Sequence, residues 1–162
     1  NYHYSLSMGE YMLLKVGDQA PQFNLKNQDG VNVSLEDLKG KRFILWFYPK
    51  ASTPGWTVEG QGFRDELNKF IDLGIKIFGV SADSVKRQKN FHTKQQFNFP
   101  LLSDESHEML QSYGVWGLKK FMGREYMGIS RVTYIINQYG LIEKVYDKVQ
   151  TKTHAKDILN DF

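Results

Sequence analysis

The residues best suited to chemistry lie in one short stretch, Pro49-Lys-Ala-Ser-Thr-Pro-Gly-Trp-Thr57. An apolar run at residues 43–48 ends at this stretch, and a helical pattern begins just after it. A side chain at position 56 would lie at a helix start, where free backbone N–H groups and the helix dipole stabilise an anion. A cysteine there would have a lowered pKa and form a nucleophilic, easily oxidised thiolate. Position 56 is instead Trp56, and the whole chain contains no cysteine.

The elements that must position this stretch follow from the spacing of apolar residues. Residues 43–48 are apolar on both faces, which is typical of a buried strand, and residues 75–81 are predicted to form a second buried strand. Residues 57–72 have apolar side chains at helical spacing, and Gly74 ends that helix. The remaining predicted elements are strands at 22–25, 31–34, 99–102, 131–137 and 141–146, a short helix from Ser34 to Gly40, and helices at 83–97, 104–113 and 152–162.

The order of these elements predicts an α/β fold with a mixed central sheet, helices on both faces and an N-terminal hairpin. A chain of 162 residues, 41% of them hydrophobic, is the size of one domain. We expect residues 14–162 to form this domain. We expect residues 1–13 to be an N-terminal extension, with 1–7 derived from cloning or processing. The longest apolar run, at 43–48, is too short to span a bilayer, and the prediction is a cytoplasmic protein.

Charge and histidine spacing argue against several other functions. The net charge is only +3, and the basic stretch at residues 86–94 has no interleaved aromatic residues, which favours a solvated helix surface over a phosphate-binding patch. His3, His92, His107 and His154 are scattered, without the spacing of metal ligands. We therefore expect no metal, no cofactor, no nucleic-acid partner and no membrane association.

The stretch around Trp56 also resembles a known family. Residues 49–65 are similar to the active-site segment of the peroxiredoxins, and most of all to the bacterioferritin-comigratory-protein branch, whose pattern is Pro-x-x-x-Thr-Pro-Gly-Cys-Thr-x-Glu. The resemblance covers roughly residues 14–162 and implies a thioredoxin-like fold. Its further landmarks, in chain order, are the segments at 16–25, 79–83, 99–104 and 131–136.

The resemblance implies a role for each matching position. Trp56 takes the place of the peroxidatic cysteine, and Gln61 that of the resolving cysteine found in many members of this branch. Thr53 corresponds to the threonine that holds the peroxide, Pro49 to the proline that shields the sulfur, and Arg131 to the arginine that supports the thiolate. Taken singly, Thr53 and Pro49 are ordinary turn residues, and Arg131 is an ordinary exposed or ion-paired side chain on a strand.

Other residues near the stretch have structural interpretations. Glu59 and Arg64 fall on the first turns of the predicted helix, where a structural role such as ion pairing is expected. Trp46, Trp116 and Phe121 are interpreted as core or interface aromatics. The segment from Trp116 to Phe121 could support a weak homodimer, and a monomer is the alternative.

The family's activity is the reduction of hydrogen peroxide and organic hydroperoxides with electrons from a thioredoxin- or glutaredoxin-like reductant. The indole of Trp56 cannot replace a thiol, because it offers one N–H donor and no comparable nucleophile. We therefore expect no thiol-dependent turnover from the chain as it stands. The alternative function is a non-catalytic protein that uses the peroxiredoxin scaffold for binding.

Three explanations for the tryptophan stay open at the level of sequence. The substitution could be deliberate, or it could be a natural loss of the nucleophile. Position 56 could also be a selenocysteine, whose UGA codon differs by one base from the tryptophan codon and can be misread as tryptophan. Gln61 fits the third explanation, because a nucleophile resolved by an external thiol needs no second cysteine.

Overall fold

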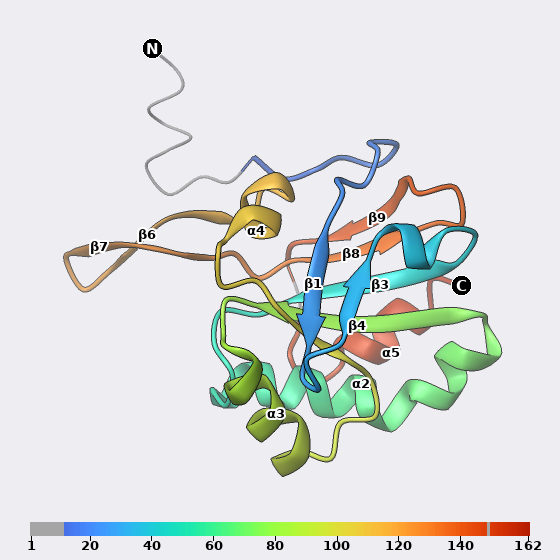
Figure 1. The fold of residues 1–162 in the computed structure, drawn as a ribbon, viewed down its shortest axis with the longest axis horizontal. Coiled ribbons are helices and arrows are strands. Elements are labelled where there is room, and N and C mark those ends of the chain that lie inside the picture. The colour runs from blue at the N-terminus through green and yellow to red at the C-terminus, as the bar shows by residue number, and fades with distance from the viewer. Residues whose placement is uncertain (1–11, 149) are drawn as a thin grey trace.

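The structure, a computed structural model, describes residues 12–148 and 150–162. Its centre is a seven-stranded sheet in the order β2-β1-β5-β4-β3-β8-β9 (Figure 1), and β6 and β7 form a separate hairpin. The strands are β1 (Asn24–Asn27), β2 (Asn32–Ser34), β3 (Arg42–Phe47), β4 (Ile75–Ser81), β5 (Leu101–Ser103), β6 (Trp116–Phe121), β7 (Arg124–Ile129), β8 (Thr133–Ile136) and β9 (Ile142–Tyr146). The helices are η1 (Glu36–Leu38), α2 (Pro54–Asp72), α3 (Val85–Lys94), α4 (Glu108–Ser112) and α5 (His154–Leu159).

The sheet is mixed, as predicted. Strands β3, β4 and β5 run parallel, whereas β1 and β8 lie antiparallel to their neighbours in the sheet. Side chains of β3 alternate between two buried clusters, one on each face. Both faces are covered, so β3 is apolar from Phe43 to Phe47 instead of alternating with polar residues.

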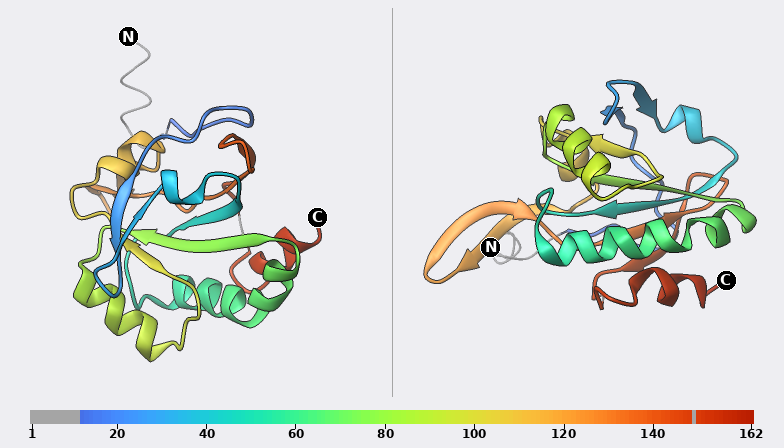
Figure 2. Two further views of the ribbon diagram at one scale, coloured as in Figure 1. Left: turned by 45° about the vertical axis from the view of Figure 1, so that its right-hand side comes forward. Right: turned by 90° about the horizontal axis from the view of Figure 1, so that it is seen from below.

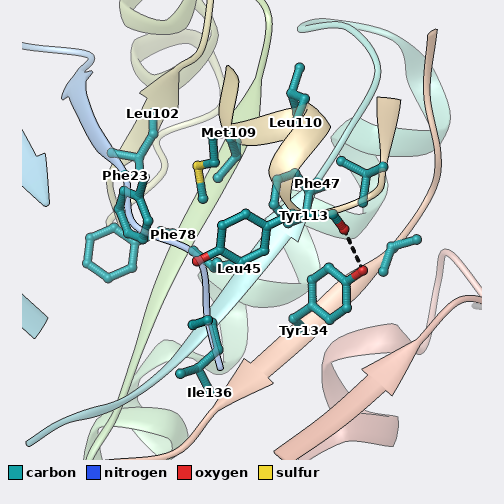
Figure 3. Close-up of a cluster of buried hydrophobic side chains, with 14 of the residues drawn as sticks. Phe23, Leu45, Phe47, Phe78, Leu102, Met109, Leu110, Tyr113, Tyr134 and Ile136 are labelled. Atoms are coloured by element: carbon teal, nitrogen blue, oxygen red, sulfur yellow. Dashed lines mark hydrogen bonds between the residues drawn. The ribbon is translucent and has the colours of Figure 1, made fainter. Parts of the chain in front are cut away.

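Helices cover both faces of the sheet, which confirms the predicted layers (Figure 2). Helices η1 and α4 contribute to one cluster, through residues such as Leu38 and Leu110. Figure 3 shows this cluster, in which the Tyr134 hydroxyl donates a hydrogen bond of 2.8 Å to the Tyr113 carbonyl. Helices α2, α3 and α5 cover the other face and supply the second cluster, with Trp46 of β3 fully buried in it. The interpretation of Trp46 as a core aromatic is therefore confirmed.

Several predicted boundaries were wrong because polar side chains cap elements inside the predicted range. Helix α3 was predicted to start at Asp83 or Ser84, and Ser84 is its N-cap, where its Oγ accepts the Arg87 N–H at 3.2 Å; the helix ends at Lys94 and not near Phe97. Asp104 does not begin α4; its Oδ2 accepts the Leu110 N–H at 2.8 Å, which closes the loop before that helix. β8 begins at Thr133, so Arg131 lies just before the strand on which it was predicted.

The hairpin of β6 and β7 was missed by the sequence analysis. Its turn, Met122-Gly123, has φ angles of 51° and 78°, the positive values that two-residue hairpin turns require. Phe121 is 65% exposed, so of its two interpretations the core aromatic was wrong and the interface aromatic stays a prediction. Trp116 is half-buried and stacks on His107 with ring centroids 4.0 Å apart. A Met-Gly pair between two runs of mixed polarity was the available signal.

The predicted N-terminal extension, residues 1–13, lies mostly outside the described residues. Leu13 packs against the core, and the Leu14 N–H donates to the Tyr134 hydroxyl at 3.0 Å. Within the described part, no helix is long and apolar enough to cross a membrane. The same residues include no cluster of three or more His, Cys, Asp or Glu side chains that could hold a metal ion.

Candidate active site

Position 56 lies in the first turn of α2, as predicted. Thr53 is the N-cap in an extended conformation, and Pro54 occupies the first turn, where its missing N–H leaves no donor unpaired. The Thr53 hydroxyl donates to the Lys50 carbonyl at 2.8 Å, which closes the loop before the helix. Ser52 in this loop has φ of 66°, a left-handed conformation that a serine rarely adopts. The loop that precedes Trp56 is therefore tightly turned and locally held.

The structure brings Arg131 to Trp56. The guanidinium carbon of Arg131 lies 4.2 Å from the centroid of the Trp56 ring, within the range of a cation–π contact. Trp56 is half-buried and packs against the second core cluster. Since the two residues are far apart in the chain, only the fold places the cation beside position 56.

Glu59 connects this pair to the core, a link that the sequence analysis missed. Its carboxylate is 1% exposed; Oε1 accepts the Trp46 indole N–H at 2.9 Å, and Oε2 accepts the Arg131 Nε–H at 2.9 Å. Arg131 Nη2 donates to the same Oε2, so the Nε–H and an Nη2–H of one guanidinium group are both hydrogen-bonded to Glu59. The available signal was the spacing of three residues from Trp56, which places both side chains on one side of the helix.

The electrostatics of this network are dominated by burial. Burial raises the pKa of the Glu59 carboxyl, while hydrogen bonds from Arg131 and Trp46 act in the opposite direction. Below the network, the His154 ring nitrogen Nε2 lies 2.8 Å from Thr133 Oγ1. Burial lowers the pKa of His154 to about 4, so this ring is neutral at pH 7. Arg131 is therefore the cation that approaches position 56 from this side.

A second buried network anchors the loop from the end of β4. Asp83 Oδ2 accepts the Ala51 N–H at 2.8 Å and the Ser81 hydroxyl at 2.7 Å. Ser81 Oγ also accepts from the Gln88 side chain at 3.0 Å, and the Tyr48 hydroxyl donates to Gln88 Oε1. Because Asp83 is 8% exposed and uses one oxygen for both bonds, the position of Ala51 is set by the interior and not by solvent.

The other two predicted site residues are placed differently from one another. Pro49 is half-buried at the end of β3, at the start of the loop that leads to position 56. Gln61 turns toward α3, where its side-chain amide donates to Gln95 Oε1 at 3.0 Å. The structure therefore brings Pro49, Thr53, Arg131 and Trp56 to one region, with Gln61 on the neighbouring side of α2.

Comparisons with known proteins place the chain in a family. The AhpC/TSA family model matches residues 16–145. The chain is 44% identical to peroxiredoxin Bcp of Escherichia coli K12 over 147 residues, which cover 91% of this chain and 94% of that protein. It is 42% identical to peroxiredoxin Bcp of Bacillus subtilis over 148 residues, covering 91% of this chain and 94% of that one.

Solved structures show the same fold. The crystal structure of a cysteine-to-serine mutant of Xylella fastidiosa PrxQ superposes with a TM-score of 0.86 at 31% identity, covering 91% of this chain and 94% of that one. The bacterioferritin comigratory protein of Xanthomonas campestris superposes with a TM-score of 0.81 at 37% identity, covering 86% and 88%. These structures confirm the predicted thioredoxin-like fold. On its sequence and its fold, the chain belongs to the peroxiredoxins of the AhpC/TSA family, in the Bcp branch.

Proposed function

We propose that this site descends from one that reduces hydrogen peroxide and organic hydroperoxides with a thioredoxin- or glutaredoxin-like reductant, and that the chain with Trp56 does not turn over. The single observation that carries the proposal is the position of Arg131. Its guanidinium lies 4.2 Å from the ring at position 56 and is held by the buried carboxylate of Glu59. A fixed cation at a helix start stabilises a thiolate and the charge that develops on the peroxide oxygen.

The proposed reaction requires a thiol at position 56. The thiolate attacks one peroxide oxygen, the O–O bond breaks, and the other oxygen leaves as water or an alcohol after taking up a proton. The thiol is thereby oxidised to a sulfenic acid. Since Gln61 replaces the resolving cysteine, the external dithiol must attack the sulfenic acid, release water and then form its own disulfide. In this proposal Thr53 holds the peroxide and Pro49 shields the sulfur.

Replacement of Trp56 by cysteine tests the proposal. We expect Trp56→Cys to consume peroxide in the presence of thioredoxin, thioredoxin reductase and NADPH, with one thiol oxidised for each peroxide in the first turnover. Mass spectrometry after dimedone treatment would detect the sulfenic acid. Trp56→Ser is the matched control and should stay inactive. A folded Trp56→Cys variant that neither consumes peroxide nor forms the sulfenic acid would contradict the proposal.

The alternative, a non-catalytic binding protein, is favoured by the contacts of the two replaced positions. Trp56 stacks against Arg131, and Gln61 hydrogen-bonds Gln95. Both side chains therefore have structural partners of their own. Sequencing codon 56 of the native gene separates the explanations: UGG indicates a natural loss, a cysteine codon a deliberate substitution, and UGA a selenocysteine or an alternative genetic code. A cytoplasmic location and a monomeric or weakly dimeric state stay predictions from the sequence.

A further inference from the structure

The amino-terminal half of β4 is a free edge of the sheet. β4 runs from Ile75 to Ser81, but it pairs with β5 only at Gly79, Val80 and Ser81 (Figure 1). Its other neighbour, β3, pairs with β4 from Ile75 to Val80. Among the described residues, about half of this strand therefore has a strand neighbour on one side only.

The backbone groups of Ile77 point toward this free side. The Val80 carbonyl accepts the Tyr48 N–H at 3.1 Å, so it faces β3, and successive residues of a strand alternate in direction. Gly79 faces the other way, since its N–H donates to the Pro100 carbonyl at 3.0 Å. Ile77, two residues earlier, has the same orientation as Gly79.

Proline at position 100 explains why the β4–β5 ladder stops. The ladder begins with Gly79 opposite Leu101, so extending it by two residues would place Ile77 opposite Phe99. The donor to the Ile77 carbonyl would then be the N–H of residue 100. Proline has no N–H. Within residues 12–148 and 150–162, nothing pairs with the N–H or the carbonyl of Ile77 on this side, although the residue is only 2% exposed. Unpaired backbone groups at an edge are a template for another strand.

Ile77 is among the residues that line a groove of about 510 Å³, which we call the edge groove. Leu67 and Ile71 of α2 form one wall, and Val33 and Leu38 form the other, with Ile77 among the lining residues between them. Ile71 is 58% exposed, so the α2 wall presents apolar surface to solvent. An extended chain in the groove could bury side chains on alternate sides against these two walls.

The charges along the edge groove favour an acidic occupant. Lys41 and Lys76 line it together with Asp37, whose Oδ2 accepts the Ser34 N–H at 3.0 Å. Burial, followed by the nearby amine of Lys41, lowers the pKa of Lys76, which means that the two cations repel each other. A carboxylate between them would relieve that repulsion.

We propose that the edge groove binds an extended segment of a partner protein, which adds a strand to β4 at Ile77 and carries apolar side chains alternating with carboxylates. Such a segment supplies both the donor and the acceptor that the Ile77 backbone lacks, which neither a lipid nor a nucleic-acid backbone does. The groove lies toward the amino-terminal end of β4, whereas the candidate active site follows the carboxyl ends of β3 and β4. The proposal is therefore independent of the chemistry at position 56.

A defined peptide tests the proposal on the chain as it exists. The probe is the fluorescein-labelled acidic peptide Ser-Val-Glu-Val-Glu-Val-Ser, with fluorescence anisotropy for affinity and NMR hydrogen exchange for the site. We expect saturable binding and exchange of the Ile77 amide slowed at least tenfold. The same peptide N-methylated on its pairing edge, and a version with Lys in place of Glu, should each bind at least tenfold more weakly.

Variants locate the peptide on the surface. Lys76→Glu and Ile71→Ser should each weaken binding about tenfold or more. The matched controls Lys156→Glu and Leu73→Ser line a different hollow beside α2 and should leave binding unchanged. Absence of saturable binding, equal binding of the N-methylated peptide, equal effects of the control variants, or tighter binding of a single-stranded dT12 oligonucleotide would each overturn the proposal.

Discussion

The two ends of β4 differ in whether their buried polar groups are hydrogen-bonded. At the carboxyl end, Ser81 and Asp83 are buried, and Asp83 accepts both the Ser81 hydroxyl and the Ala51 N–H of the loop that carries Thr53. At the amino-terminal half, the Ile77 backbone is equally buried but has no partner on its outer side among the described residues. Among the buried side-chain polar atoms of the described residues, the Ser103 hydroxyl has no hydrogen-bond partner. Most of the buried polar groups at the carboxyl end are therefore hydrogen-bonded, but not all of them.

The difference follows from what the chain places at each end. The loop after β4 returns Asp83 to the interior, where it accepts the Ala51 N–H and fixes the loop before α2, while Gln88 of α3 donates to the Leu102 carbonyl of β5. At the other end, Pro100 stops β5 from extending along β4. One end thereby holds the loop of the proposed peroxide site, and the other is the edge at which we propose that a peptide binds.

The largest expected effect is at the site end, from removal of the Glu59 carboxylate. Glu59→Ala leaves the Trp46 indole N–H and the Arg131 guanidinium without their acceptor, and should lower the free energy of unfolding by about 3–4 kcal/mol. Urea denaturation measures the change. The control is Glu36→Ala, whose carboxylate is 63% exposed and pairs with Lys39, and which should cost under about 0.5 kcal/mol. Equal costs for the two variants would contradict the network.

Acid should weaken the site end through His154. The pKa of His154 falls from 6.5 to about 4 on folding, so the unfolded chain binds more protons between these values. This contribution to stability is complete above pH 6.5 and is lost as pH falls toward 4, by about 3 kcal/mol in all. Urea denaturation across this range measures the slope. His154→Gln should flatten it, and an unchanged slope in that variant would show that another group is responsible.

A smaller effect is expected from the anchor of the loop. Asp83→Ala removes the acceptor of the Ala51 N–H and of the Ser81 hydroxyl, which should cost about 2 kcal/mol. Hydrogen exchange should accelerate at the Ala51 amide and stay the same at Ile77, because the two ends are separate. Asp83→Asn keeps the shape and one acceptor and should be intermediate. Equal acceleration at both amides would mean that the two ends are coupled.

The smallest effect on stability is expected at the edge groove. Pro100→Ala supplies an N–H that can donate to the Ile77 carbonyl, but it also frees the unfolded chain from the restriction of proline. The two effects oppose each other, so stability should change by less than about 1 kcal/mol. Hydrogen exchange should show a protected amide at residue 100, and the acidic peptide should bind more weakly. If the amide of residue 100 is protected but the peptide binds as before, the peptide does not depend on pairing with the Ile77 backbone.

The sequence alone determined much of the scaffold. The all-apolar run at 43–48, the largely apolar run at 75–81 and the helical spacing at 57–72 appear as β3, β4 and α2, because periodicity records which faces are buried. The helix start before Trp56 was likewise readable, since Thr53, Pro54 and Gly55 are local signals. Trp56 itself stood out as the departure from an otherwise complete pattern.

Only the tertiary structure decided how distant residues meet. Glu59 and Arg131 are 72 positions apart. Their ion pair depends on how α2 packs on the sheet and on the order of the strands within it. The free edge at Ile77 depends on how far β5 extends along β4. The exposure of Phe121 depends on a hairpin that packs little of its length against the core. Local sequence patterns determine which side chains are buried, but the tertiary packing of the whole chain determines which of them contact one another.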